Sequence, residues 1–309
     1  MNAPARAEAS QRRMAIAQGL TMAVIALAAF AAGVGLSVPS VYRETEWVVP
    51  QNRGQDLVTL LALLVLMPVL AAARRGSPRS TLVWLGLVGY LAYTYTGAAF
   101  AYGFNVLFPV YVALFALSGA VLIAALSGID AHALLPAFDA GTPRRGVIVF
   151  LLVLAAVLTL LWASQIVPFY TRGQLPEMIV KAKTPTVFVY VLDLGVVVPL
   201  SLLAARWLAQ GRAWGHVLAG FVLVKAATMG LALLALLLWW EALGWDMAVA
   251  GWYGGAGGFA LRSNWWTQRL LHDGGRMLSG LALAAAVVLA WRPLGPTRGT
   301  RRLRYAWLG

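Results

Sequence analysis

Long apolar runs recur along the chain and constrain its fold more than any other feature. A helix needs about 20 predominantly apolar residues to cross the hydrocarbon core of a bilayer. The segments that satisfy or approach this length are 14–38, 57–73, 81–102, 106–127, 146–167, 186–207, 215–239 and 274–291. The sequence therefore predicts an all-α integral membrane helix bundle of about eight transmembrane helices, forming one domain over 1–309.

Composition supports a lipid environment. The chain is 61% hydrophobic and only 11% charged, whereas a soluble domain needs a far more polar exterior. The net charge of +13 does not indicate nucleic-acid binding, because the basic residues are spread among short loops. The lipid bilayer is thus the expected partner, and no nucleic acid is expected.

The distribution of Arg and Lys predicts the orientation. If the N-terminus is cytoplasmic, the inner segments hold fifteen basic and three acidic residues, and the outer segments hold eight basic and seven acidic residues. Cytoplasmic segments carry an excess of basic residues. We therefore expect a multi-pass membrane protein with both termini cytoplasmic and 292–309 as a basic cytoplasmic tail. The run 14–38 is longer than a signal-peptide core of about 7–15 residues, so we interpret it as a retained span.

The segment 241–276 is expected to be an extracytoplasmic loop. It contains a Gly-rich apolar stretch, 247–261, that is short for a span. Treating this stretch as a further span would place the basic tail outside, so we expect a re-entrant or interfacial segment. Near its end the loop carries an amphipathic, Trp-rich run. This run is a lid, an extracytoplasmic catalytic site or a docking surface for a partner, or else an interfacial helix on the headgroups. Its polar and aromatic members are Trp265, Trp266, Arg269, His272 and Asp273.

Two ionisable residues lie well inside predicted spans, where each costs roughly 2.5–3.5 kcal/mol on insertion scales. They are Asp193 in span 186–207 and Lys225 in span 215–239. Their positions along the two helices differ by about 9 Å at 1.5 Å per residue, and their side chains lean apart. A direct ion pair therefore needs strong tilt. The alternatives are a proton or cation site at Asp193, or a hydrogen-bonded structural Asp193 with Lys225 extending toward the cytoplasmic face.

Hydroxyl and amide side chains gather where spans 81–102 and 106–127 join. Tyr90 and Thr94 share one helix face by their spacing, and Tyr93 is beside them. Asn105 is placed to cap the helix that follows. These four residues predict either a polar pocket facing the bundle or an aromatic interface with a hairpin turn.

The residues that most often hold metals and cofactors are scarce. The chain has no Cys, and its three His are far apart in sequence. No metal-ligand spacing, nucleophile elbow or phosphate loop is visible. We therefore expect neither cofactor nor metal, and no catalytic residue is assigned.

Two stretches resemble a group of uncharacterised multi-pass membrane proteins from bacteria. They are YLAYTYTGAAFAYGFNVLFPVYVALF, and VLDLGVVVPLSLLAARWL followed by GHVLAGFVLVK. The resemblance covers spans three to seven at most. It implies a multi-pass fold in the bacterial inner (plasma) membrane without an established activity. It includes the Tyr and Asn hairpin and both Asp193 and Lys225.

Three functions remain open. The first is translocation or sensing of a small solute or ion through the bundle, with Asp193 as the key group. The second is a non-catalytic subunit or assembly factor that docks on a membrane-protein partner through its outer loops. The third is a membrane enzyme acting on a lipid-linked substrate, which lacks a visible catalytic set.

Overall fold

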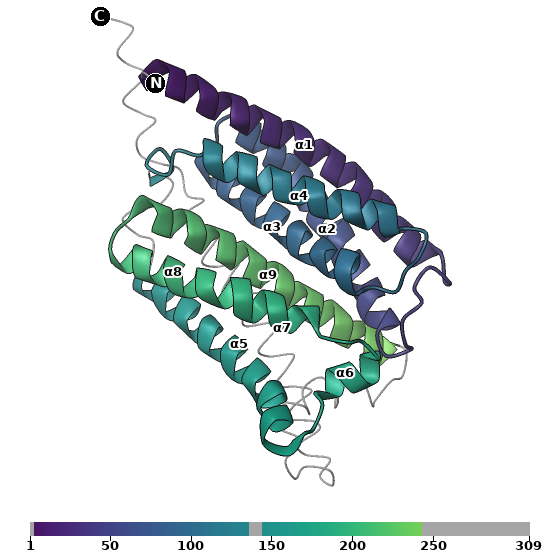
Figure 1. Ribbon diagram of the computed structural model, residues 1–309. Coiled ribbons are helices and arrows are strands. Elements are labelled where there is room, and N and C mark those ends of the chain that lie inside the picture. The colour runs from purple at the N-terminus through teal and green to yellow at the C-terminus, as the bar shows by residue number, and fades with distance from the viewer. Residues whose placement is uncertain (1–2, 136–143, 243–309) are drawn as a thin grey trace, which may run out of the picture.

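The computed structural model describes residues 3–135 and 144–242, and within these ranges every regular element is a helix (Figure 1). The long elements are α1 (Ala3–Ser37), α2 (Val49–Arg74), α3 (Pro78–Ala101), α4 (Phe108–Gly128), α5 (Arg144–Arg172) and α9 (Ala213–Ala242). The remaining ones are α6 (Glu177–Ala182), followed by one continuous helical segment that consists of α7 (Phe188–Leu192), η2 (Asp193–Val197) and α8 (Val198–Ala209).

Seven helical segments of the described chain are long and apolar enough to cross a membrane. Within the described residues they confirm the all-α fold, and they coincide with the first seven predicted spans. Large apolar side chains on their outer faces, such as Phe100, Leu160 and Ile123, are 70–73% exposed. Such faces suit contact with lipid. The eighth predicted span (274–291), the loop 241–276 and the tail 292–309 lie outside the described residues, apart from the last two residues of α9.

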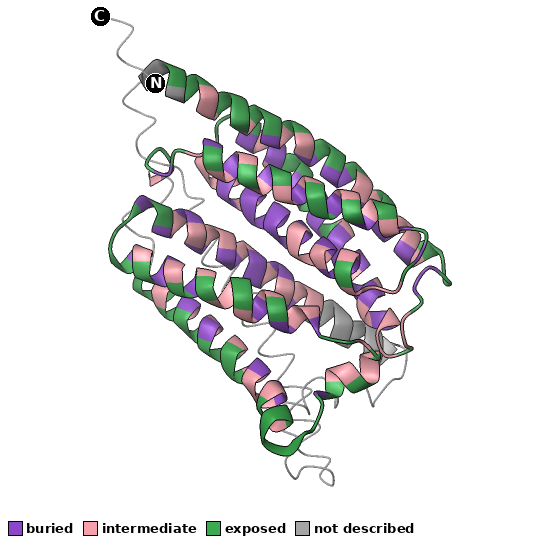
Figure 2. Ribbon diagram, in the orientation of Figure 1, coloured by how far each residue is buried: buried purple, intermediate pink, exposed green. Residues whose placement is uncertain are grey.

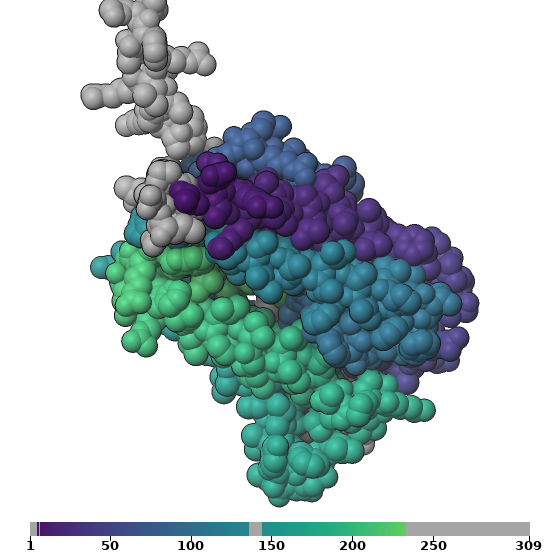
Figure 3. Space-filling model, turned by 45° about the horizontal axis from the view of Figure 1, so that its top comes forward, coloured from purple at the N-terminus to yellow at the C-terminus, as the bar shows by residue number. Residues whose placement is uncertain are grey.

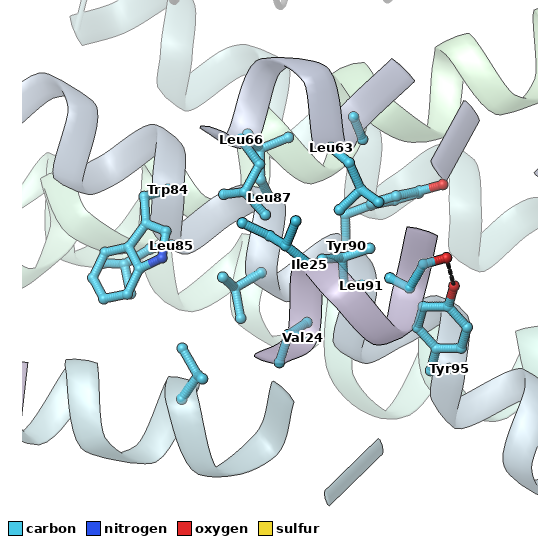
Figure 4. Packing of buried hydrophobic residues seen from close by; sticks show 14 of the residues in the cluster. Val24, Ile25, Leu63, Leu66, Trp84, Leu85, Leu87, Tyr90, Leu91 and Tyr95 are labelled. Atoms are coloured by element: carbon cyan, nitrogen blue, oxygen red, sulfur yellow. Dashed lines mark hydrogen bonds between the residues drawn. The ribbon is translucent and has the colours of Figure 1, made fainter. Parts of the chain in front are cut away.

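The seven helices form two groups (Figure 1). α1, α2, α3 and α4 pack together around one hydrophobic core, and α5, α8 and α9 pack around a second. Figure 4 shows the first core, in which Leu66, Leu85 and Leu91 are almost fully buried. Figure 3 shows the surface hollowed where the two groups meet.

Helix α3 connects the two groups. It is the most buried of the seven, as Figure 2 shows, and it packs against α2, α4 and α9. Glycines let the partner side chains approach its backbone closely: a Cβ atom on Gly89 would lie 2.3 Å from the ring of Phe221, and one on Gly97 would lie 2.3 Å from that of Phe188. Small residues serve this purpose in membrane helix packing.

The two ends of the bundle differ in charge. We name the end at which α1 starts the basic end, and the other the opposite end. At the basic end Arg144 donates hydrogen bonds of 2.7 Å to the carbonyls of Leu208 and Ala209, and so caps the last turn of α8. The described Arg residues with side chains at the basic end include Arg12, Arg13, Arg74, Arg75, Arg79, Arg144, Arg145, Arg206 and Arg212.

Helix α2 begins earlier than the apolar pattern predicts. The predicted span starts at residue 57, but the helix starts at Val49 and has a proline in its first turn. Proline suits this place because it lacks the N–H that the helix start leaves unpaired. Asp56, assigned to the outer loop in the charge count, is therefore inside a helix and buried.

Candidate functional site

Asp193 lies at a local change of helix type. The chain forms a π-helical turn over Asp193–Val197, and the N–H of Val198 bonds to the carbonyl of Asp193. Pro199 follows, and it cannot donate the bond that an α-helix would require there. The wider turn accommodates this missing donor. Single π-helical turns within α-helices often occur at functional sites.

Two helices hold the carboxylate of Asp193, whose side chain is 1% exposed. The hydroxyl of Tyr93 on α3 donates to Oδ1, and the indole Nε1 of Trp162 on α5 donates to Oδ2, both at 2.9 Å. Tyr190 packs on Trp162 with a ring separation of 4.7 Å. Both oxygens of the buried carboxylate are therefore satisfied, which offsets part of its desolvation cost.

Lys225 does not pair directly with Asp193, because Tyr93 contacts both side chains and lies between them. Its Nζ atom lies 3.5 Å from the centroid of the Tyr93 ring and 3.6 Å from Sδ of Met229. Its charge interacts with that of Asp193. No direct ion pair joins these two described side chains. The result is a carboxylate, a tyrosine and an ammonium in series, with the tyrosine touching both ions.

The direction of Lys225 corrects one of the two alternatives. With the orientation expected from the charge distribution, a lysine that extends along its helix toward the cytoplasmic face would point to the basic end. Met229 is one turn further toward the opposite end, so the ammonium points that way, and Lys225 is only 6% exposed. The attraction of the Tyr93 ring and of Asp193 outweighs the ordinary tilt of helical side chains.

The predicted polar pocket is divided between the two sides of α3. Tyr93 belongs to the Asp193 cluster, but Tyr90 and Thr94 face α2, where the amide of Gln55 donates to both of their hydroxyls. Tyr90 also shares a hydrogen bond of 3.1 Å with Thr59. Three residues that the sequence places near one another on α3 thus serve two different interfaces, because successive helical positions point in different directions.

Asn105 does not cap α4 as predicted, because Leu107 is the residue at the helix start; Asn105 forms the turn before it. Its Oδ1 accepts a hydrogen bond of 2.8 Å from the N–H of Leu107, and its carbonyl accepts one from Phe108. This local bond satisfies a helix-start donor, as an Asx turn does. The predicted outer-loop surface of Trp265, Trp266, Arg269, His272 and Asp273 lies outside the described residues.

Sequence reasoning missed Trp162. Tryptophans near membrane helix ends are expected to mark the lipid interface, but Trp162 stands ten residues before the end of α5 at Arg172 and is 4% exposed. That interior position is the signal that could have found it. A buried indole N–H needs an acceptor, and the nearest unexplained intramembrane acid is Asp193.

The arrangement offers protonation chemistry more readily than metal binding. Among the residues that the structure describes, no group of three or more His, Cys, Asp or Glu side chains is placed to hold a metal ion. A metal at Asp193 would also have to displace its two hydrogen-bond donors. A proton, by contrast, needs no additional ligand. Its binding removes the negative charge of Asp193, which lies close to Tyr93 and interacts with Lys225.

Comparison with protein-family models, curated proteins and solved structures showed no match to this chain. The fold class is that of a helical bundle with several apolar, membrane-length helices, as in multi-pass membrane proteins. Function is therefore argued from the site itself.

Proposed function

We propose that the protein moves or senses a small solute or ion through its helix bundle, and that protonation of Asp193 controls this process. The observation that carries the proposal is the Asp193–Tyr93–Lys225 series, which joins α3 of the first helix group to η2 and α9 of the second. Intramembrane ionisable residues commonly mark ion or proton pathways.

Protonation would change the forces between the two helix groups. With Asp193 ionised, the buried ammonium of Lys225 has a counter-charge near Tyr93. With Asp193 neutral, that ammonium is buried without one, which is costly in a low-dielectric interior. The packing between α3 and α9 then becomes less favourable. A change of this kind can bias a bundle between two arrangements.

A spectroscopic distance measurement tests this proposal. The chain has no Cys, so cysteines introduced at the exposed positions Ile123 on α4 and Leu202 on α8 can carry spin labels without interference. In liposomes we expect the label-to-label distance distribution to shift between alkaline and acidic buffer. The shift should vanish in the double variant Asp193→Asn/Lys225→Met, which has no charge to titrate at this site.

Either of two results would reject the proposal. One is a distance distribution that does not depend on pH in the otherwise wild-type protein. The other is an unchanged pH response in the double variant, which would assign the response to other groups. In the first case Asp193 and Lys225 would be structural. The alternative of a subunit that docks through 241–276 depends on residues outside those described.

We further propose that the basic end is cytoplasmic in the bacterial plasma membrane. The clustering of Arg at that end supports this orientation. Seven crossings place Ala242 at the opposite end. For the Arg-rich tail 292–309 to lie on the cytoplasmic side, the chain must cross once more, as the predicted span 274–291 would.

Labelling from one side of the membrane tests the orientation. Ser40, at the opposite end, and Ala133, at the basic end, are both exposed. In intact cells with a permeabilised outer membrane, a membrane-impermeant maleimide should label Ser40→Cys and leave Ala133→Cys unlabelled until the inner membrane is disrupted. Labelling in the reverse order would invert the proposed topology, and labelling of a cysteine at Thr300 before disruption would remove the eighth crossing.

A further inference from the structure

A second buried carboxyl lies at the opposite end of the first helix group. Asp56 on α2 is 8% exposed, and its Oδ2 accepts a hydrogen bond of 2.5 Å from the hydroxyl of Tyr42. Tyr42 belongs to the segment 38–48 that links α1 to α2, which we name the strap. Burial, with the negative charge of Asp56 beside it, raises the pKa of Tyr42 far above its usual range. This hydroxyl therefore stays protonated and acts as a donor.

Four tyrosines surround this carboxyl. The ring of Tyr102 lies 6.0 Å from that of Tyr42 and 5.8 Å from that of Tyr111, and the rings of Tyr111 and Tyr95 are 6.3 Å apart. All four interact electrostatically with Asp56. They come from the strap, α3, its following loop and α4, so the cluster joins segments far apart in sequence. An acid within a group of aromatic rings is the environment that favours a bound cation.

Among the described residues, no cation forms an ion pair with Asp56. Arg53 interacts with Asp56 at a distance, but no ion pair joins them, and its guanidinium donates to the carbonyl of Pro39. Glu44, whose Oε1 accepts from the N–H of Gly103, adds a second acid near Tyr102 and Tyr111. Arg43, the neighbour of Glu44 in the strap, is exposed and lies against Gly103, so neither of the two nearby bases pairs with Asp56. Buried acids are normally paired or neutralised.

Unlike the Asp56 site, the Asp193 site contains an ammonium group. There, a tyrosine hydroxyl binds a buried carboxylate, and the Lys225 ammonium lies 3.5 Å from the centroid of that tyrosine ring. The Asp56 site repeats the carboxyl and the tyrosine hydroxyl without an ammonium. The same chemistry would be completed there by an ammonium group that a ligand brings.

Buried polar atoms without a hydrogen-bond partner indicate a second polar group on such a ligand. Asn105 lies beside the hydroxyl of Tyr111, yet Nδ2 of Asn105 and Oη of Tyr111 make no hydrogen bond of ordinary geometry, although these residues are 5% and 3% exposed. Unpaired buried polar atoms are rare and need an explanation. An amide N–H requires an acceptor, such as a hydroxyl oxygen on the ligand.

We propose that the Asp56 cluster binds a small organic ammonium compound that also carries an oxygen acceptor. Asp56 supplies the counter-charge, the rings of Tyr42, Tyr102 and Tyr111 contact the ammonium, and Asn105 donates to the oxygen. The strap covers the site, so the ligand enters from the opposite end as Tyr42 moves aside. Gly35 lets the Asp56 carboxyl and the Tyr42 hydroxyl pack closely against α1, since a Cβ atom there would lie 2.0 Å from Oδ2 of Asp56 and 2.5 Å from the Tyr42 hydroxyl.

Thermal unfolding of the purified full chain in detergent tests the proposal. The probes are choline, tetramethylammonium and sodium, as chlorides at equal ionic strength. Binding to the folded state alone raises the melting temperature with ligand concentration. We expect choline to stabilise most, tetramethylammonium less because it lacks an oxygen, and sodium least. Asp56→Asn should weaken the apparent affinity for choline about tenfold or more, because the counter-charge is lost.

Two further variants keep this test decisive. Glu46→Gln removes an exposed acid from the same strap and should leave the choline response unchanged. Tyr102→Leu keeps Asp56 and removes one ring, so it should abolish the preference for choline over sodium even if Asp56→Asn does not fold. Equal stabilisation by all three salts, or an unchanged preference in Tyr102→Leu, would overturn the proposal.

Discussion

Replacing Asp193 by Asn, or Lys225 by Met, is expected to lower the free energy of unfolding by about 3–5 kcal/mol in each case, because either change leaves a buried charge without its counter-charge. Asn has nearly the same shape as Asp. It can still accept a hydrogen bond from Trp162, and its amide can donate one to the Tyr93 hydroxyl. The loss in free energy of unfolding therefore comes from the missing charge. Met is unbranched like Lys, although one atom shorter, and directs an apolar end toward Met229. Reversible unfolding in mixed micelles gives both values.

The double variant should recover a large part of this loss. Removing both charges also removes the cost of burying them, so the two changes together should cost less than their sum by more than about 1 kcal/mol. This result would make the double variant the right reference for the pH-dependent distance measurement, since it is folded but carries no titratable group at the site. Additive losses would show that the two charges do not interact.

A surface ion pair provides the matched control. Lys181 and Glu177 on α6 are 2.7 Å apart, with side chains 32% and 44% exposed. Exposed pairs contribute little because water already solvates both ions. Lys181→Met should therefore cost less than about 1 kcal/mol in the same assay. A loss at Lys181 as large as that at Lys225 would mean that the substitution itself, rather than burial, determines the effect.

Replacing Gly215 by Ala is the second change with a large expected effect. A Cβ atom at this position would lie 2.4 Å from the backbone nitrogen of Leu208 and 2.6 Å from the carbonyl carbon of Trp207. Backbone atoms of α8 cannot rotate away as a side chain does, so the α8–α9 turn must open. We expect a loss of about 3 kcal/mol, at the upper end of the range for overpacking, measured by the same unfolding assay.

Gly220 on the same helix is the control for this change. A Cβ atom there would meet only atoms of Leu82, at 3.6–3.8 Å, which is ordinary contact. Since Ala favours a helix over Gly by about 1 kcal/mol, Gly220→Ala should be neutral or slightly stabilising. Similar losses at the two positions would show that the close approach of α9 to α8 does not limit stability.

The helices could be predicted from sequence because membrane spans depend on local properties. Length and hydropathy alone identify α3, α4 and α5, since a bilayer requires each span to satisfy its own backbone hydrogen bonds. The start of α2 could not be predicted in this way. Its first turns, from Val49, are polar and lie at the end of the bundle, where neighbouring segments rather than lipid bury Asp56.

The site was predictable in composition but not in arrangement. Asp193 and Lys225 stand out because charged residues are rare within apolar runs. Nothing local indicates that Tyr93 separates them, or that Trp162 from another helix holds the second oxygen of the carboxylate. These contacts depend on how α3, α5 and α9 are rotated about their axes, and packing between distant segments decides that rotation.

The sequence by itself determined that this chain is a bundle of apolar helices with one strongly basic end and two ionisable residues deep within spans. Only the tertiary structure decided which polar groups share a site. In the packed bundle Tyr93 is hydrogen-bonded to Asp193 and Tyr90 to Gln55. Tyr42 is hydrogen-bonded to Asp56. The physical reason is that hydropathy acts residue by residue, whereas a buried charge is stabilised by whichever partners the packed helices place around it.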